Sequence, residues 1–198
     1  MAKKLKPGLL LVVLLCLGAL LKAQHKNQTG FDLAVGAQSF YAPFIKAHPT
    51  GLQPVAMAGV NHSFNARNTF SVTLRIGYGR HSKQGDAIFT HLMFNYTPTL
   101  FRHLELGVGA GAGYQMAFYP GKALQWNGEE WVKGKSYKGV VQVPLRVSIG
   151  FKGIAAAKGS FTPYLAYQAH GLFRYNPSLT PLPVSNFLLG VKYVSTQK

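Results

Sequence analysis

An unbroken alternation of side chains along residues 104–119, LELGVGAGAGYQMAFY, constrains the fold of this chain more than any other feature. Apolar or aromatic residues fill every second position, and the positions between them include Gly107, Gly109, Gly111 and Gly113. Since successive side chains of a β-strand point to opposite faces, this period of two predicts a strand with one apolar face. Its length matters too, because a membrane strand needs about 9–11 residues and a globular strand usually has about 5–6.

The same alternation recurs along the rest of the chain, most clearly in TFSVTLRIGYG. Strands are predicted at residues 30–40, 54–64, 69–79, 86–96, 103–119, 136–151, 160–173 and 185–193. Their connections tend to alternate between short and long, although 152–159 is longer than a tight turn. Such alternation is typical of a transmembrane barrel with short periplasmic turns and long external loops, and it places both chain ends on the periplasmic side.

The first residues, MAKKLKPGLLLVVLLCLGALLKAQ, have a basic start, an apolar run from Leu9 to Leu21, and the small residue Ala23. This is the pattern of a secretory signal peptide, whose apolar run is too short for a spanning helix. We expect residues 1–23 to be removed, leaving one domain over 24–198. The sole cysteine, Cys16, lies in this segment, so the mature chain is expected to have no disulfide or thiolate site.

Charge limits the choice of partners. Four of the 21 basic residues lie in the predicted signal, which leaves 17 against five acidic residues and a net charge of +12. A basic chain can bind nucleic acid. An exported chain instead meets anionic lipid head groups and acidic glycans, so we expect no nucleic-acid partner.

Apolar and polar residues alternate along the strands of both a soluble sandwich and a membrane barrel, but only the barrel turns its apolar face outward to lipid. Long apolar faces, aromatic residues near strand ends, and polar residues in mid-strand favour the barrel. The predicted fold is therefore all-β, an eight-stranded antiparallel up-and-down transmembrane β-barrel, whose interior is only wide enough for side chains and holds no wide pore.

Polar residues in mid-strand are expected to form a network inside this barrel. The predicted members are Arg75, Glu105, Gln142, Arg146 and Gln168. Glu105 is expected to be the only mid-strand carboxylate in the barrel interior, and Arg75 and Arg146 are its candidate partners. A structural network is favoured over a gate whose pairing switches, because buried ions need partners merely to exist.

The signal peptide, the eight alternating strands, the glycine-rich strand and a final strand with GVKY at 190–193 resemble the small outer-membrane β-barrel proteins of Gram-negative bacteria. The resemblance implies an outer-membrane location, insertion by the barrel assembly machinery, and contact with outer-membrane lipids or lipopolysaccharide. We expect a monomer. Many such proteins end on an aromatic residue that the assembly machinery reads, whereas here Tyr193 is followed by VSTQK and would have to serve as an inset signal.

Two motifs suggest other chemistry. Residues 107–112 match the GxGxxA dinucleotide pattern, but the alternation continues through Phe118, so the helix that this motif requires does not begin. The histidines are scattered, without metal-ligand spacing, and are expected to be isolated in the interior or in loops. They are His25, His48, His62, His81, His91, His103 and His170. We therefore expect no metal and no cofactor.

Residues 169–178, AHGLFRYNPS, are similar in outline to the end of the outer-membrane lipid A deacylases. The resemblance implies that His170 is the general base and Asn176-Pro177 the following turn. Leu172, however, stands where the nucleophilic serine should be, and a serine hydrolase needs its nucleophile within reach of the base. A lipid A-modifying enzyme is therefore the alternative to a barrel without catalytic activity.

The segment 120–135 is the most distinctive loop, since it holds both tryptophans of the chain, Trp126 and Trp131, together with Lys133 and Lys135. Aromatic rings among mixed charges predict a loop that contacts a ligand or glycan. The alternative is that both rings rest on the membrane interface or the barrel rim. The function predicted overall is a structural or surface-interacting barrel, and a soluble exported barrel that carries a ligand is a third possibility.

Overall fold

The computed structural model describes residues 29–39, 51–65, 67–81, 85–121, 124–156, 159–175 and 180–195. The predicted signal peptide, His25, His48 and the Asn176-Pro177 turn lie outside the described residues, and removal of residues 1–23 stays a prediction. Among the described residues, no helix is long and apolar enough to cross a membrane.

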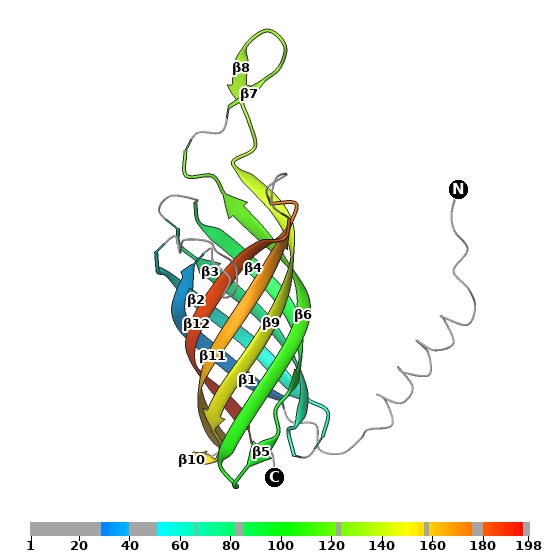
Figure 1. Cartoon of the computed structure of the whole chain (residues 1–198), viewed down its shortest axis with the longest axis vertical. Coiled ribbons are helices and arrows are strands. Elements are labelled where there is room, and N and C mark those ends of the chain that lie inside the picture. Colours follow the sequence, from blue (N-terminus) through cyan, green and yellow to red (C-terminus); the bar gives the residue numbers. More distant parts are fainter. Residues whose placement is uncertain are drawn as a thin grey trace, which may run out of the picture.

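Eight long strands form one closed antiparallel barrel (Figure 1). They are β1 Thr29–Ser39, β2 Gln53–Ser63, β3 Phe70–Gly79, β4 Ala87–Tyr96, β6 Leu104–Phe118, β9 Tyr137–Phe151, β11 Gly159–Phe173 and β12 Leu182–Ser195. Each strand pairs with the next one along the chain, and β12 pairs back with β1 through a register that includes Gly30 opposite Val194. The predicted fold class is confirmed.

The last strand is the one whose limits differ most from the prediction. It was expected at 185–193, but it runs from Leu182 to Ser195. Pro181 and Pro183 favoured a loop at this point, because proline cannot donate to a ladder. Pro183 nevertheless lies in register with Gly171 of β11, within the strand.

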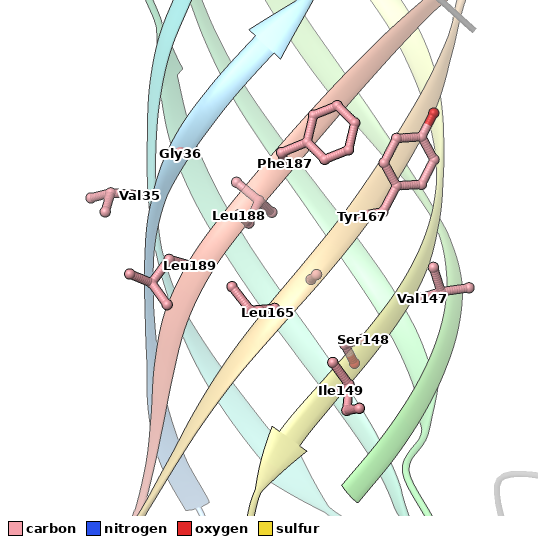
Figure 2. Close-up of a pocket in the computed structure, with 11 residues that line it drawn as sticks. Val35, Gly36, Val147, Ser148, Ile149, Leu165, Tyr167, Phe187, Leu188 and Leu189 are labelled. Carbon is pink, nitrogen blue, oxygen red and sulfur yellow. The ribbon is translucent and has the colours of Figure 1, made fainter. Parts of the chain in front are cut away.

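The outer face of the barrel is apolar, whereas the inner face combines polar and small residues with a buried apolar cluster that includes Met57, Phe89 and Leu188. In β3, Leu74 and Ile76 are 55% and 59% exposed, whereas Thr73 and Arg75, which alternate with them, are buried. Figure 2 shows the same arrangement across β1, β9, β11 and β12, where the outward side chains line a shallow apolar groove. They are Val35, Val147, Ile149, Leu165, Tyr167, Phe187 and Leu189. A surface of this kind suits membrane hydrocarbon, because exposing so large an apolar area to water is unfavourable.

The connections differ at the two ends of the barrel. The turns within 64–69, 97–103 and 152–158 lie at the end where β1 begins and β12 ends. Two short strands add to that end: β5 (Thr99–Leu100) pairs with the start of β6, and β10 (Ile154–Ala156) pairs with the start of β11. At the other end, a separate hairpin of β7 (Leu124–Trp126) and β8 (Trp131–Lys133) stands well beyond the barrel (Figure 1).

The glycine-rich strand β6 has the predicted faces, with Leu106, Val108, Ala110 and Ala112 outward and the glycines inward. We had expected Arg75, Arg146 or Tyr164 to fill the space that the glycines leave. This expectation is wrong for the nearest contacts, which are made by side-chain and backbone atoms of the adjacent strands. A Cβ atom would lie 2.3 Å from Ser148 Oγ at Gly107, 2.6 Å from Asn95 Oδ1 at Gly109, and 2.6 Å from His91 Cβ at Gly113. Tyr164 instead lies over Gly190 of β12.

Candidate functional site

A buried ion pair joins β1 and β3 inside the barrel. Arg75 Nε donates to Asp32 Oδ1 over 2.8 Å, and Nη2 donates to Oδ2 over 3.0 Å. Tyr164 Oη lies 3.0 and 3.1 Å from the two carboxylate oxygens. Asp32 is only 1% exposed and was missing from the predicted interior network. The signal for it was present, since Asp32 alternates with the apolar residues Phe31 and Leu33.

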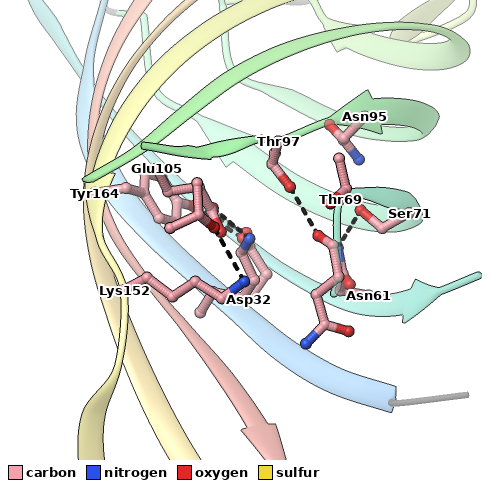
Figure 3. Close-up of polar contacts among 12 residues, drawn as sticks. Asp32, Asn61, Thr69, Ser71, Asn95, Thr97, Glu105, Lys152 and Tyr164 are labelled. Carbon is pink, nitrogen blue, oxygen red and sulfur yellow. Dashed lines mark hydrogen bonds and ion pairs between the residues drawn. The ribbon is translucent and has the colours of Figure 1, made fainter. Parts of the chain in front are cut away.

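Glu105 pairs with Lys192, whose Nζ lies 2.7 Å from Oε1. The expected pairing of Glu105 with Arg75 or Arg146 is wrong, because Arg75 is taken by Asp32. Glu105 lies at the start of β6 and Lys192 near the end of β12, so both occupy the end of the barrel where the chain termini enter and leave. Figure 3 shows Glu105, Tyr164 and Asp32 gathered on one side of the interior.

Lys152, in the turn that follows β9, lies at the same end of the barrel as Glu105 and Lys192. Its Nζ donates to the backbone oxygen of Arg67 over 2.9 Å and to Thr99 Oγ1 over 3.2 Å. Partial burial lowers the pKa of Lys152, and the nearby Glu105 carboxylate opposes that shift. The turn is therefore tied to two neighbouring turns by one ammonium group.

Arg146 takes part in neither ion pair. Its Cζ lies 4.5 Å from the centre of the Tyr164 ring, in a cation–π arrangement. Its Nε is buried without a hydrogen-bond partner among the described residues. The predicted network thus contains one arginine that is paired with a carboxylate and one that is not.

Neutral polar groups lie beside the charged ones in the interior. On β2, β3 and β4, Asn61 Nδ2 donates to Thr73 Oγ1 over 2.8 Å and to Ser71 Oγ over 3.1 Å, and Asn95 Nδ2 donates to Thr73 Oγ1 over 2.9 Å. Figure 3 shows Asn61, Ser71 and Asn95 in the interior. These amide–hydroxyl contacts link the three strands beside the charged groups. The structure therefore fills this part of the barrel with side chains, as expected of eight strands.

Gln168 and His170 form a separate group with Asn186. Nε2 of His170 lies 3.0 Å from Gln168 Nε2 and 2.8 Å from Asn186 Nδ2, with donor and acceptor roles that depend on the tautomer. Gln142 Nε2 donates to the backbone oxygen of Thr90 over 3.3 Å. The expected single network is therefore divided into a charged group, a carboxamide–imidazole group, and Gln142, which bonds to a backbone oxygen.

His91 and His170 are not isolated, contrary to expectation. Their ring centres lie 5.9 Å apart in an edge-on arrangement, and Phe89 contacts both rings. Sequence spacing could not show this, because the two histidines come together only across the barrel. Among the described residues, no group of three or more His, Cys, Asp or Glu side chains could hold a metal ion.

The two tryptophans face each other on the external hairpin. Trp126 and Trp131 are opposite in register, with ring centres 5.6 Å apart, and they are 51% and 66% exposed. Asn127 Oδ1 accepts hydrogen bonds from the backbone N–H groups of Glu129 (2.9 Å) and Glu130 (2.8 Å), which fixes the tip. The indoles therefore contact each other, and the hairpin that carries them stands beyond the rim of the barrel (Figure 1).

A groove of about 840 Å³ lies between the base of this hairpin and the outer ends of β6 and β9. It is lined mainly by aromatic and basic side chains, which are Tyr114, Tyr119, Tyr137, Lys135 and Lys138. Lys138 Nζ donates to the backbone oxygen of Tyr175 over 2.9 Å, whereas Lys133 and Lys135 are exposed. The four residues predicted for binding thus lie on one hairpin and its return segment, beside a concave surface.

No family model and no curated protein sequence matches this chain. Among solved structures, it is similar to Neisserial surface protein A, with 10% identity, a TM-score of 0.54, and coverage of 84% of this chain and 96% of the other. It also matches Ail of Yersinia pestis (11% identity, TM-score 0.49, 86% and 99% covered) and the N-terminal β-barrel domain of Pseudomonas aeruginosa OprF (12%, 0.48, 85% and 99%). The resemblance drawn from the sequence is confirmed at the level of fold: the chain has the eight-stranded architecture of the small outer-membrane β-barrels.

Proposed function

We propose that this protein is a non-catalytic β-barrel of the Gram-negative outer membrane whose external hairpin binds lipopolysaccharide. The observation that carries the proposal is the exposed Trp126–Trp131 pair, 5.6 Å apart on a hairpin beyond the barrel and followed by Lys133 and Lys135. Large exposed rings at such a position suit a binding surface, because they contribute apolar contact area at a small cost in side-chain entropy.

Location supports this choice of partner. The apolar outer face of the barrel suits a membrane, and the hairpin lies at the end away from the chain termini, which is the external end in the usual barrel orientation. Lipopolysaccharide occupies that side of the outer membrane and presents phosphates and sugars. Each lysine close to an anionic membrane surface contributes about 1 kcal/mol. The hairpin and the tyrosine- and lysine-lined groove at its base therefore match this surface in position and charge.

Insertion by the barrel assembly machinery belongs to the same proposal. Tyr193 lies on the outward face of β12, and its ring is 5.0 Å from that of Phe161. An assembly factor can reach a ring on this face although two further residues of β12 follow it. We expect the inserted protein to be a monomer.

The surroundings of His170 support the absence of catalysis. Its ring is 4% exposed inside the barrel and contacts the carboxamides of Gln168 and Asn186. A general base acts on a nucleophile within about 2.6–3.2 Å, and Leu172, at the position of the deacylase serine, is a buried apolar side chain. Mass spectrometry of lipid A from cells with wild-type protein or His170→Ala tests this point, and a mass change that depends on His170 would overturn the proposal.

Tryptophan fluorescence tests the binding, because both tryptophans of the chain lie on the hairpin. The mature protein in phospholipid nanodiscs is titrated with lipopolysaccharide, and we expect the emission maximum to move to shorter wavelength as the indoles leave water. The variant K133Q/K135Q should bind about tenfold or more weakly, since two lysines near an anionic surface contribute about 2 kcal/mol.

The matched control is Arg102→Gln, which removes an exposed positive charge at the opposite end of the barrel. Its affinity should equal that of the wild type. An unchanged emission spectrum at high lipopolysaccharide, or equal loss of affinity in K133Q/K135Q and R102Q, would contradict the hairpin site.

A further inference from the structure

One small cavity inside the barrel is lined by five charged side chains. They are Asp32, Arg75, Glu105, Arg146 and Lys192. Three of them are cations and two are carboxylates, so the lining carries a formal net charge of +1. A buried net charge is costly unless an opposite charge lies beside it.

The two carboxylates are already engaged. Both oxygens of Asp32 accept from Arg75 and lie within hydrogen-bonding distance of Tyr164 Oη, and Glu105 pairs with Lys192. Arg146 lies near Asp32 but forms an ion pair with neither carboxylate, and its guanidinium lies over the face of the Tyr164 ring. An aromatic ring carries no net charge and compensates a buried cation only in part. The unbalanced cation of the cavity is therefore Arg146, which is 7% exposed and has a buried Nε without a partner among the described residues.

No other acidic side chain of the protein can supply the missing charge. The chain has five Asp and Glu residues in total. The remaining three, Asp86, Glu129 and Glu130, lie in connections at the opposite end of the barrel. A guanidinium also stays protonated in proteins, so Arg146 cannot become neutral by losing its proton. An anion from solution would balance the cavity.

The cavity limits the size of that anion. Its volume is about 20 Å³, against about 10–15 Å³ for the space that holds one water molecule. A monatomic anion fits, whereas phosphate, sulfate or a carboxylic acid does not. Gly107 of β6 lines the cavity, and a Cβ there would lie 2.3 Å from Ser148 Oγ.

We propose that the barrel interior binds one chloride-sized anion in this cavity, with Arg146 as its principal partner and with Ser148 and Lys192 in the surrounding wall. The anion balances the third cation, which allows the charged group to stay buried within the membrane. Lys192, whose side chain is 12% exposed, is the most exposed of the five charged residues. This site is independent of lipopolysaccharide binding at the hairpin.

The direct test is a crystal of the mature protein soaked in sodium bromide and measured at the bromine absorption edge. We expect one anomalous peak inside the cavity, within contact distance of Arg146 Nε, in the wild-type protein. The variant Arg146→Met, which removes the unbalanced charge while keeping an unbranched apolar stem, should lack that peak. A wild-type cavity without bromide would overturn the proposal, whatever the behaviour of the variant.

The second test measures unfolding in phospholipid vesicles while chloride replaces gluconate at constant ionic strength. Gluconate is too large for the cavity. Binding to the folded state alone lowers the unfolding equilibrium constant by the factor 1 + [Cl⁻]/Kd, which is about elevenfold at ten times Kd. Arg102→Met, which removes an exposed arginine, should keep this dependence, and Arg146→Met should lose it. Equal chloride dependence in both variants would overturn the assignment to Arg146.

Discussion

The substitution Asp32→Asn removes the carboxylate that neutralises Arg75. Asp32 is 1% exposed and accepts two hydrogen bonds from Arg75, at 2.8 and 3.0 Å. Removing one partner of a buried ion pair costs about 3–5 kcal/mol, because the remaining charge is buried without compensation. Asparagine keeps the shape and one oxygen acceptor, so we expect the lower part of this range, about 3 kcal/mol. Arg146, the second arginine near this carboxylate, increases the expected loss.

The measurement is the free energy of unfolding in phospholipid vesicles, from denaturant titrations followed by circular dichroism and by the migration of unboiled samples in detergent gels. Tryptophan fluorescence is unsuitable, because both tryptophans lie on the hairpin beyond the barrel. The control is a double-mutant cycle with Arg75→Met. Since the two residues are in contact, the double variant should be more stable than the sum of the single losses predicts, by about 1 kcal/mol or more.

Two results would refute this reasoning. One is a loss below about 1 kcal/mol for Asp32→Asn, which is the scale of an exposed ion pair. The other is strict additivity of the two substitutions, which would mean that the contact contributes no coupling energy.

Three further predictions concern space, charge and pH. Gly109→Leu should destabilise the barrel by about 1–3 kcal/mol or more through overpacking, whereas Ala110→Leu on the outer face should leave its unboiled gel band unchanged. Glu105→Gln should cost about 1–2 kcal/mol in the same denaturant titrations, less than Asp32→Asn, because its lysine partner is partly exposed. The hydrogen bond from Tyr78 lowers the pKa of Asp86 below the usual value for an aspartate. Its contribution to stability is therefore complete above that usual value and is lost as the pH falls through the lowered pKa. Between pH 5 and pH 2, the wild type should therefore lose more stability than Asp86→Asn; equal losses would contradict this.

The strands and their faces could be predicted because each strand has lipid on one side and the filled interior on the other. Polarity therefore changes at every residue along the strand. Leu74 and Arg75 are adjacent in sequence, and their environments differ as completely as the alternation indicates. The last strand was predicted too short, because prolines at its start resemble a loop. The short pair β7–β8 was predicted only as a loop, although Asn127-Gly128 is a common turn sequence.

The pairing of charges inside the barrel could not be predicted in the same way. Asp32 and Arg75 are 43 residues apart, and Glu105 and Lys192 are 87 apart, so their contacts depend on the register and closure of several strands. Alternation shows which face a residue occupies but not its height in the barrel relative to other strands. This is why Arg146 was expected to pair with a carboxylate, although the structure places it over Tyr164.

The outward orientation of the apolar face is tested most directly with two neighbouring leucines of β12. Leu188 is 3% exposed and Leu189 is 58% exposed, and the predicted mature chain has no cysteine of its own. Leu188→Cys and Leu189→Cys are spin-labelled in phospholipid vesicles, and collisions with oxygen and with a water-soluble nickel chelate are measured. The label at Leu189 should meet oxygen but not the chelate, and the label at Leu188 should be immobilised and reach neither. Ready collision of the Leu189 label with the chelate, or lipid exposure of the Leu188 label, would contradict the barrel described above.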